Sequence, residues 1–300
     1  MPKTEKTWRV LELLNWSAEY LSARGIENAR LNAERLLGRI LNLDRVQLYL
    51  DFDRPLTEAE LLRFKEYIKR RLGHEPLQYI LEECEFMSLR FKVNPGVMIP
   101  RPETEILVET VLETCREKFP SKNPIRILEV GTGSGCIAVS LAKHLPVVRV
   151  LAIDISDDAL NTAAENARLN EVDDRIQFRQ LDFMRADFPK QLSETFDVLV
   201  SNPPYISDKD FPNLPVEIKE YEPLIALKDG SDGLSFYHKF AQLSSSLLNP
   251  SGLVAVEVGL GQAAMVEKIF LEHTFSKVTS YKDLNGIERV VCGEIENTTK

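Results

Sequence analysis

The stretch that decides the fold spans residues 125–135 and reads IRILEVGTGSG. Its first six residues are mostly apolar and rich in isoleucine and valine, which is typical of a strand buried in a sheet. Gly131, Gly133 and Gly135 follow at alternate positions. Glycines at this spacing let the backbone turn sharply and pass close to a ligand. The stretch therefore predicts the first strand of a sheet that binds a small molecule at its carboxyl edge.

The chain beyond residue 125 alternates between short apolar runs and longer helical segments. Runs typical of strands cover 125–130, 148–153, 175–179, 196–201 and 252–258. Segments with helical periodicity cover 134–145, 157–170, 233–248 and 261–272. This alternation predicts a parallel sheet built from strand–helix–strand units. Two later runs, near 275–281 and 287–292, predict an antiparallel pair at one edge.

The first eighty residues are expected to be helical throughout. Apolar side chains recur at helical spacing from Trp8 to Leu21 and again from Leu31 to Leu41. Thr57 and Glu60 have capping-box spacing, so a third helix is expected to begin there. Basic residues between 63 and 71 are interrupted by an acid, and we interpret them as a solvated helix face rather than a binding patch.

Residues 85–99 change character and mix apolar with polar side chains around the turn signal Asn94-Pro95-Gly96. This pattern predicts a β-hairpin. A helix from Pro102 to Phe119 follows it, since proline suits the first helical turn. We therefore divide the chain into a helical domain at 1–82, a hairpin linker at 83–100 and an α/β domain at 101–300.

Composition and charge exclude several classes of protein. The 300 residues are 44% hydrophobic, which is enough for two folded domains, and no apolar run approaches the length of a membrane span. Lys plus Arg number 37 against 46 Asp plus Glu, so the net charge is −9 and nucleic acid is repelled at long range. The polar N-terminus and the widely spaced cysteines predict a cytoplasmic protein without a signal peptide, disulfide framework or metal site.

A nucleoside cofactor is indicated by the acid that ends the second strand, Asp154, because a carboxylate there can accept both ribose hydroxyls. Dinucleotide sites normally read GxGxxG. Residues 129–135 instead read EVGTGSG, which matches the first motif of S-adenosylmethionine methyltransferases better. On the loop and the acid alone, S-adenosylmethionine is favoured, and NAD and a purely structural turn remain open.

The fourth strand ends in Asn202-Pro203-Pro204-Tyr205. Neither proline has an N–H to donate, so the strand stops and the segment is held stiffly at the carboxyl edge of the sheet. An –NH₂ group offers two donors, and the Asn202 side-chain oxygen and the Pro203 carbonyl can accept one each. The motif therefore predicts a site that turns a planar –NH₂ nitrogen toward a methyl donor.

Asn-Pro-Pro-Tyr at this place resembles the signature of class I methyltransferases that act on DNA adenine, rRNA guanine or protein glutamine. Other segments resemble the HemK/PrmC family of release factor glutamine methyltransferases, and the match covers nearly the whole chain. These segments are GHEPLQYI at 73–80, IPRPETE at 99–105, YEP at 221–223, DGSDG at 229–233 and NGIERV at 285–290.

The resemblance implies a Rossmann-like, mostly parallel seven-stranded sheet with a small N-terminal bundle that recognises the substrate. It implies N5-methylation of the glutamine in the Gly-Gly-Gln motif of class I peptide-chain release factors, a step connected with translation termination. In the branch that methylates a large-subunit ribosomal protein, the counterpart of residues 101–105 reads Ser-Pro-Ile-Gly-Glu, whereas this chain has RPETE. A ribosomal protein and a nucleic-acid amino group remain the alternative substrates. We expect a monomer whose partner is a protein, not a nucleic acid or a membrane.

The resemblance also assigns roles to single residues. Asn202, Pro203 and Tyr205 are expected to orient the amide, and Pro204 joins them in binding substrate. The expected cofactor contacts are Gly131, Thr132, Gly133, Ser134, Gly135, Asp154, Asp182, Phe183 and Asn202. No side chain near the motif is an obvious strong base, so catalysis is expected to come from orientation, with the proton lost late.

For each of three further residues, two interpretations stay open. Phe183 stands where family members often carry tryptophan, and it is either an adenine contact or a core aromatic. Glu129 either contacts the cofactor or accepts hydrogen bonds from the amides of the glycine loop. Arg101 either holds the domain junction over the site or pairs with Glu105.

Overall fold

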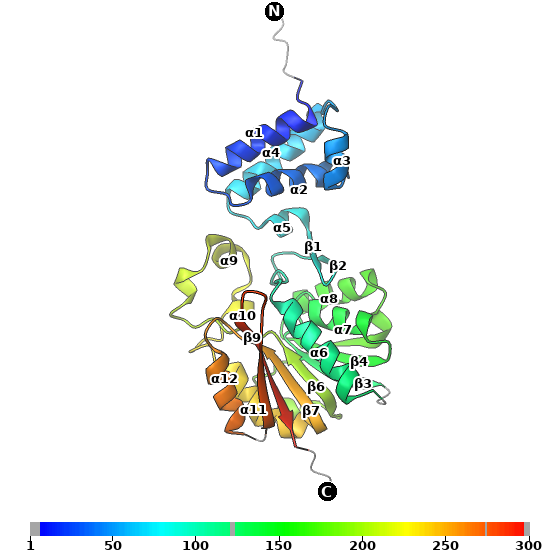
Figure 1. The fold of residues 1–300 in the computed structure, drawn as a ribbon, viewed down its shortest axis with the longest axis vertical. Coiled ribbons are helices and arrows are strands. Elements are labelled where there is room, and N and C mark those ends of the chain that lie inside the picture. Colours follow the sequence, from blue (N-terminus) through cyan, green and yellow to red (C-terminus); the bar gives the residue numbers. More distant parts are fainter. Residues whose placement is uncertain (1–6, 121–123, 274, 297–300) are drawn as a thin grey trace, which may run out of the picture. The chain divides into compact units, whose positions relative to one another are not determined.

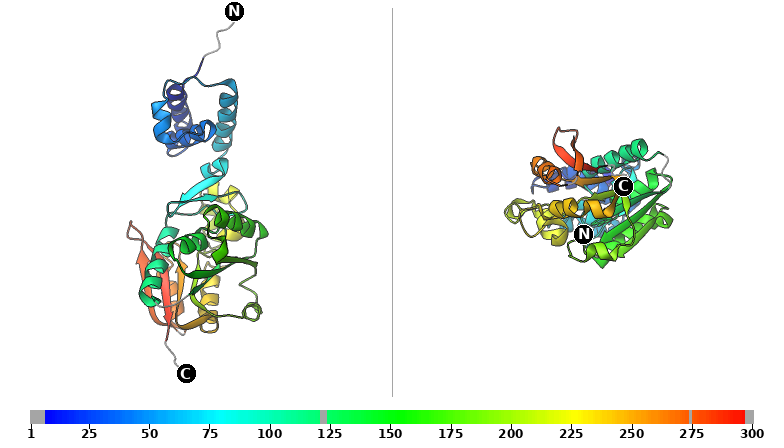
Figure 2. Two further views of the ribbon diagram at one scale, coloured as in Figure 1. Left: turned by 90° about the vertical axis from the view of Figure 1, so that its right-hand side faces the viewer. Right: turned by 90° about the horizontal axis from the view of Figure 1, so that it is seen from below.

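The computed structural model describes residues 7–120, 124–273 and 275–296. The chain divides into two compact units. The first comprises the residues up to Glu82 together with Val216–Tyr221, and the second comprises Glu83–Pro215 and the residues from Glu222 onward. Both are drawn in Figure 1 and Figure 2.

The first unit is a helical bundle with its own apolar core. Its helices are α1 (Val10–Ser22), α2 (Ala29–Leu41), α3 (Arg45–Leu50), α4 (Glu58–Leu72) and α5 (Leu77–Leu81). The predicted capping box is confirmed, because Thr57 caps α4 and exchanges hydrogen bonds with Glu60. The short helix α3 was not predicted, although Asp44 and Gln47 form a second capping box at its start.

Helix α9 (Val216–Tyr221) belongs to this first unit, whereas our sequence-based division places these residues in the α/β domain. The physical reason is a buried charge. The Arg71 guanidinium is almost fully buried and donates to the Glu217 carboxylate at 2.5 Å, and a buried cation needs such a partner. The Tyr221 hydroxyl also donates to the Gly73 carbonyl at 2.6 Å.

The second unit contains a seven-stranded sheet with the order β5-β4-β3-β6-β7-β9-β8. The strands are β3 (Ile125–Val130), β4 (Val148–Asp154), β5 (Ile176–Gln180), β6 (Phe196–Ser201), β7 (Leu248–Glu257), β8 (Phe275–Lys282) and β9 (Glu288–Ile295). The first five in this order pair in parallel, and β9 runs antiparallel to both β7 and β8. The predicted parallel sheet with an antiparallel edge is confirmed, and this edge is red in Figure 2.

Helices cover both faces of this sheet. Strand–helix–strand units are right-handed, so the helices pass to the other face where the strand order reverses. Helices α6 (Thr104–Lys118), α7 (Cys136–His144) and α8 (Asp157–Leu169) pack against one another in sequence. Helices α11 (Ser235–Leu247) and α12 (Ala263–Leu271) share a core with Leu128, Leu151 and Leu199. The short elements are η1 (Asp173–Arg175), η2 (Phe188–Gln191), η3 (Phe211–Asn213) and α10 (Leu224–Leu227). Among the described residues, no helix combines the length and apolarity needed to cross a membrane.

The β-hairpin consists of β1 (Glu83–Phe86) and β2 (Leu89–Lys92), and its turn differs from the predicted one. The chain reverses at Met87 and Ser88, whose φ values of 50° and 59° give the two-residue loop that matches strand twist. Asn94-Pro95-Gly96 forms a separate turn after β2, with the Gly96 N–H donating to the Asn94 side chain. A Met-Ser pair gives no turn signal, so the hairpin register was not predictable from local chemistry.

Candidate active site

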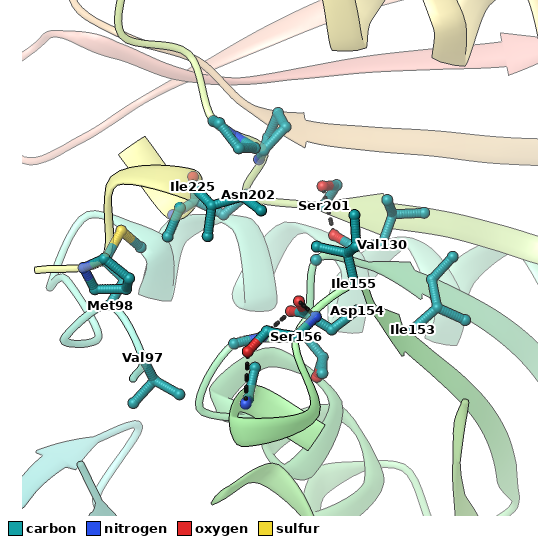
Figure 3. Close-up of a pocket in the computed structure, with 18 of the residues that line it drawn as sticks. Val97, Met98, Val130, Ile153, Asp154, Ile155, Ser156, Ser201, Asn202 and Ile225 are labelled. Carbon is teal, nitrogen blue, oxygen red and sulfur yellow. Dashed lines mark hydrogen bonds between the residues drawn. The ribbon is translucent and has the colours of Figure 1, made fainter. Parts of the chain in front are cut away.

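A cavity of about 310 Å³ opens at the carboxyl edge of the sheet, where the loops after β3, β4, β5 and β6 meet. Its volume lies at the lower end of the range for small-molecule sites. Segments 96–104 and 223–229 complete the wall. Figure 3 shows Asp154, at the end of β4, and Asn202, directly after β6, facing this one space.

The glycine loop forms part of the cavity wall through backbone conformations that other residues rarely adopt. Gly131, Gly133 and Gly135 have φ values of 73°, 54° and 80°. A Cβ on Gly135 would lie 2.9 Å from the Cβ of Ala163, so this glycine is also required for packing against α8. Around Gly131 and Gly133 a Cβ would meet no atom within 4 Å, so the space beside them stays clear for a ligand. Thr132 and Ser134 complete the loop in the same wall.

Asp154 ends β4 beside this loop and is held by two backbone N–H groups. Its Oδ2 accepts from Gly133 at 2.9 Å, and its Oδ1 accepts from Ser156 at 3.0 Å. A carboxylate has about four acceptor positions, so each oxygen keeps capacity for one more donor. The side chain is therefore oriented and still able to accept a pair of hydroxyls.

Glu129 is fully buried beneath the loop, and the described residues of the cavity wall do not include it. Its Oε2 accepts from the Thr132 hydroxyl at 2.6 Å. Burial raises the pKa of Glu129 to about 8, so the carboxyl is mainly protonated at neutral pH. The loop contact of Glu129 is thus made through the Thr132 hydroxyl, whereas the sequence-based interpretation expected the loop's backbone amides. A cofactor contact of Glu129 stays a prediction.

Asp182 and Phe183 follow β5 and both line the cavity. The Phe183 ring is nearly fully buried among aromatic side chains. Its centroid lies 4.7 Å from that of Phe240 and 5.1 Å from that of Phe188, and Phe236 stacks at 6.4 Å. Phe183 is thus a core aromatic that reaches the cavity wall, and its adenine contact stays a prediction.

Asn202, Pro203 and Pro204 line the cavity, whereas Tyr205 is not among the described residues of its wall. The Tyr205 hydroxyl donates to Glu257 Oε1 at 3.4 Å, and its carbonyl accepts from Gln262 at 3.0 Å. Burial first, then the Glu257 carboxylate, raises the pKa of Tyr205. The structure therefore places three residues of the motif at the cavity, and a substrate contact of Tyr205 stays a prediction.

The ionic partner of Arg101 is not Glu105, so the second of its two interpretations is wrong, and the first stays a prediction. Arg101 donates to Glu222, a buried carboxylate, at 2.5 Å. Glu105 instead accepts the Met87 N–H at 2.6 Å in the hairpin turn. A local Arg–Glu spacing suggested a pair within one helical turn, but the nearly fully buried carboxylate is the one that requires a cation.

Several wall residues were missed by sequence reasoning, and they are mostly apolar. They lie before α6, after β4, in α10 and at the start of α11: Val97, Met98, Pro100, Ile155, Ile225 and Phe236. The position of Ile155 gave a signal in the sequence, because this apolar residue directly follows the acid that ends a strand. In the structure its side chain is 46% exposed. The other residues come together only through tertiary contacts.

The comparisons with known proteins agree with this geometry. A family model described as PrmC N-terminal domain matches residues 12–81, and one described as methyltransferase small domain matches residues 102–217. Among solved structures, a methyltransferase from Pyrococcus furiosus superposes with a TM-score of 0.51 at 18% identity, over 77% of this chain and 99% of that one. The hMettl16 catalytic domain in complex with an RNA hairpin superposes with a TM-score of 0.53 at 16% identity, over 83% of this chain and 87% of that one. Fold and site together define a class I, S-adenosylmethionine-dependent methyltransferase.

Curated relatives narrow this class. The release factor glutamine methyltransferase of Geobacter sulfurreducens is 42% identical over 98% of this chain and 100% of its own length. That of Chlorobaculum tepidum is 41% identical over 96% and 98%. The chain belongs to the family of release factor glutamine methyltransferases.

Proposed function

We infer that this enzyme transfers a methyl group from S-adenosylmethionine to the N5 amide nitrogen of the glutamine in the Gly-Gly-Gln motif of class I release factors. The observation that carries the proposal is that Asn202 and Pro203 share one cavity wall with the glycine loop and Asp154. An acceptor set for an –NH₂ group thus lies beside a nucleoside site. The curated relatives support the release factor as substrate.

The cavity fits the proposed cofactor. Clear space beside Gly131 and Gly133 suits a methionine portion that needs no phosphate contact, and Asp154 keeps acceptor capacity for a ribose. When bound, S-adenosylmethionine supplies an electrophilic methyl group. In the described part of the chain, no three His, Cys, Asp or Glu side chains are grouped as metal ligands.

Orientation is the main contribution of the protein to the reaction. An amide nitrogen is a weak nucleophile because its lone pair is delocalised into the carbonyl group. Lys228 lines the cavity, but its Nζ is engaged in an ion pair with Asp208 at 2.6 Å. Asn202 Oδ1 and the Pro203 carbonyl instead accept the two amide hydrogens and turn the nitrogen toward the methyl group. As positive charge develops on the nitrogen, these fixed acceptors stabilise it, and the proton leaves late.

The helical unit is proposed to recognise the release factor, and the enzyme is proposed to act as a cytoplasmic monomer. A direct assay tests the central proposal by following methyl transfer from labelled S-adenosylmethionine to a release factor. A second release factor, with the glutamine of Gly-Gly-Gln changed to alanine, is the control. Label in both proteins, or in a ribosomal protein or RNA instead, would contradict the proposed substrate.

A further inference from the structure

We propose that Glu257 and Thr104 are positioning residues that fix which end of the Asn202 side-chain amide faces the substrate. The three residues come from separate parts of the second unit: the end of β7, the start of α6 and the loop after β6. The inference rests on the proposed function, because it concerns how the amide-orienting asparagine is itself oriented.

The hydrogen bonds form one directed chain. Asn202 Nδ2 donates to Thr104 Oγ1 at 3.1 Å. The Thr104 hydroxyl donates to Glu257 Oε2 at 2.6 Å, and both of these side chains are almost fully buried. The Tyr205 hydroxyl donates to the other carboxylate oxygen, Oε1, at 3.4 Å. Two residues of the Asn-Pro-Pro-Tyr motif are therefore tied to the same buried carboxylate.

The direction of this chain follows from counting protons. An ionised carboxylate only accepts, and a hydroxyl carries a single hydrogen. Once the Thr104 hydrogen is committed to Glu257, Thr104 Oγ1 can only accept from its other neighbour. Asn202 must then present its –NH₂ to Thr104 and its oxygen elsewhere. A flipped amide would set two oxygens against each other with no hydrogen between them. This chain of hydrogen bonds thus leaves Asn202 Oδ1 free to accept a hydrogen bond from the substrate.

A buried carboxylate is costly, and an apolar side chain would serve the packing at the end of β7 with less penalty. The titratable and charged groups that face Glu257 are Glu103, Cys136, Tyr205, Arg289 and Tyr237, and Tyr237 donates to the Glu257 backbone carbonyl at 2.9 Å. Burial is the main cause that raises the pKa of Glu257 to about 7, with the Glu103 charge acting in the same direction. Protonated Glu257 can itself donate to Thr104, which frees the Thr104 hydrogen to point at Asn202. The directional constraint is therefore present above about pH 7 and is lost as the pH falls.

Substitutions that remove or keep the hydroxyl test this directly. We expect Thr104→Val to lower the single-turnover rate roughly tenfold, about the effect of one lost hydrogen bond, with cofactor affinity within twofold of the parent enzyme. Thr104→Ser keeps the hydroxyl and should recover most of that rate. Thr110→Val provides a matched control, because Thr110 is a buried threonine of the same helix outside the cavity.

The Glu257→Gln variant tests the source of the direction. An amide can donate as well as accept, so we expect a loss of rate similar to that of Thr104→Val. In the parent enzyme the rate should fall as the pH drops below about 7, and this fall, the acid limb, should be absent in Glu257→Gln. Parent-like rates in Thr104→Val, or an unchanged acid limb in Glu257→Gln, would overturn the proposal. Should Glu257→Gln fail to fold, the comparison of Thr104→Val with Thr104→Ser decides alone. If the parent enzyme methylates no release factor, the proposed function fails instead, which is a separate outcome.

Discussion

Replacing Asn202 by alanine is the most direct test of the mechanism. The substitution removes the Oδ1 acceptor for the substrate amide and the 3.1 Å hydrogen bond to Thr104. Thr104 keeps its bond to Glu257, so no buried donor is left without a partner. The cost in folding stability should therefore be near that of one net hydrogen bond, about 1 kcal/mol. Loss of one preorganised partner in the transition state costs more, about 10²–10³ in rate, or about 2.7–4 kcal/mol.

These two costs can be measured separately. Single-turnover transfer with saturating labelled S-adenosylmethionine and excess enzyme gives the rate. Calorimetric titration gives the cofactor affinity, which we expect to fall far less because Gly131, Gly133 and Asp154 are untouched. A rate within a few-fold of the parent enzyme would refute the assignment of Asn202 as the amide-orienting residue.

Asn202→Asp separates the acceptor from the donor end of the side chain. The carboxylate keeps an acceptor for the substrate but offers no hydrogen to Thr104, whose single hydrogen can then reach only one of the two carboxylates, the introduced one or that of Glu257. We therefore expect activity between those of the parent enzyme and the alanine variant. Equal inactivity of the alanine and aspartate variants would mean that the Asn202 –NH₂ is also essential, and acceptance of hydrogen bonds alone would not explain the role.

Three further outcomes test other parts of the chain. Asp154→Ala should weaken cofactor binding by about 1–3 kcal/mol in calorimetry, and parent-like affinity would show that the ribose binds elsewhere. Glu129 holds a proton in the folded state from about pH 4.5 to 8 that it lacks when unfolded, so stability falls as pH rises through this window. In urea unfolding, the stability of Glu129→Gln should fall less between pH 5.5 and 8 than that of the parent enzyme. An equal fall would mean that a group other than Glu129 causes the pH dependence. Deleting residues 1–82 should abolish methylation of intact release factor while cofactor binding persists, and full activity would remove the recognition role of the helical unit.

Helix α9 illustrates why some of the organisation was not predictable. The pattern of residues 216–221 contains no signal for the first unit, since a glutamate in a short polar helix is ordinarily solvated. Only the folded chain brings Glu217 to Arg71, 146 residues earlier. The same limit explains Arg101, whose partner Glu222 lies 121 residues away, while a nearer glutamate looked equally suitable in the sequence.

The sequence by itself determined the strands at 125–130 and 196–201, the Thr57 capping box, the glycine loop and the Asn-Pro-Pro-Tyr motif, because each depends on local periodicity, backbone freedom or missing donors. The tertiary structure alone decided the Met87-Ser88 turn, the apolar wall of the cavity and the chain from Asn202 through Thr104 to Glu257. Those two hydrogen bonds join residues 98 and 153 positions apart. Such partners are selected by sheet register and helix packing, which bring distant side chains within bonding distance only after the chain has folded.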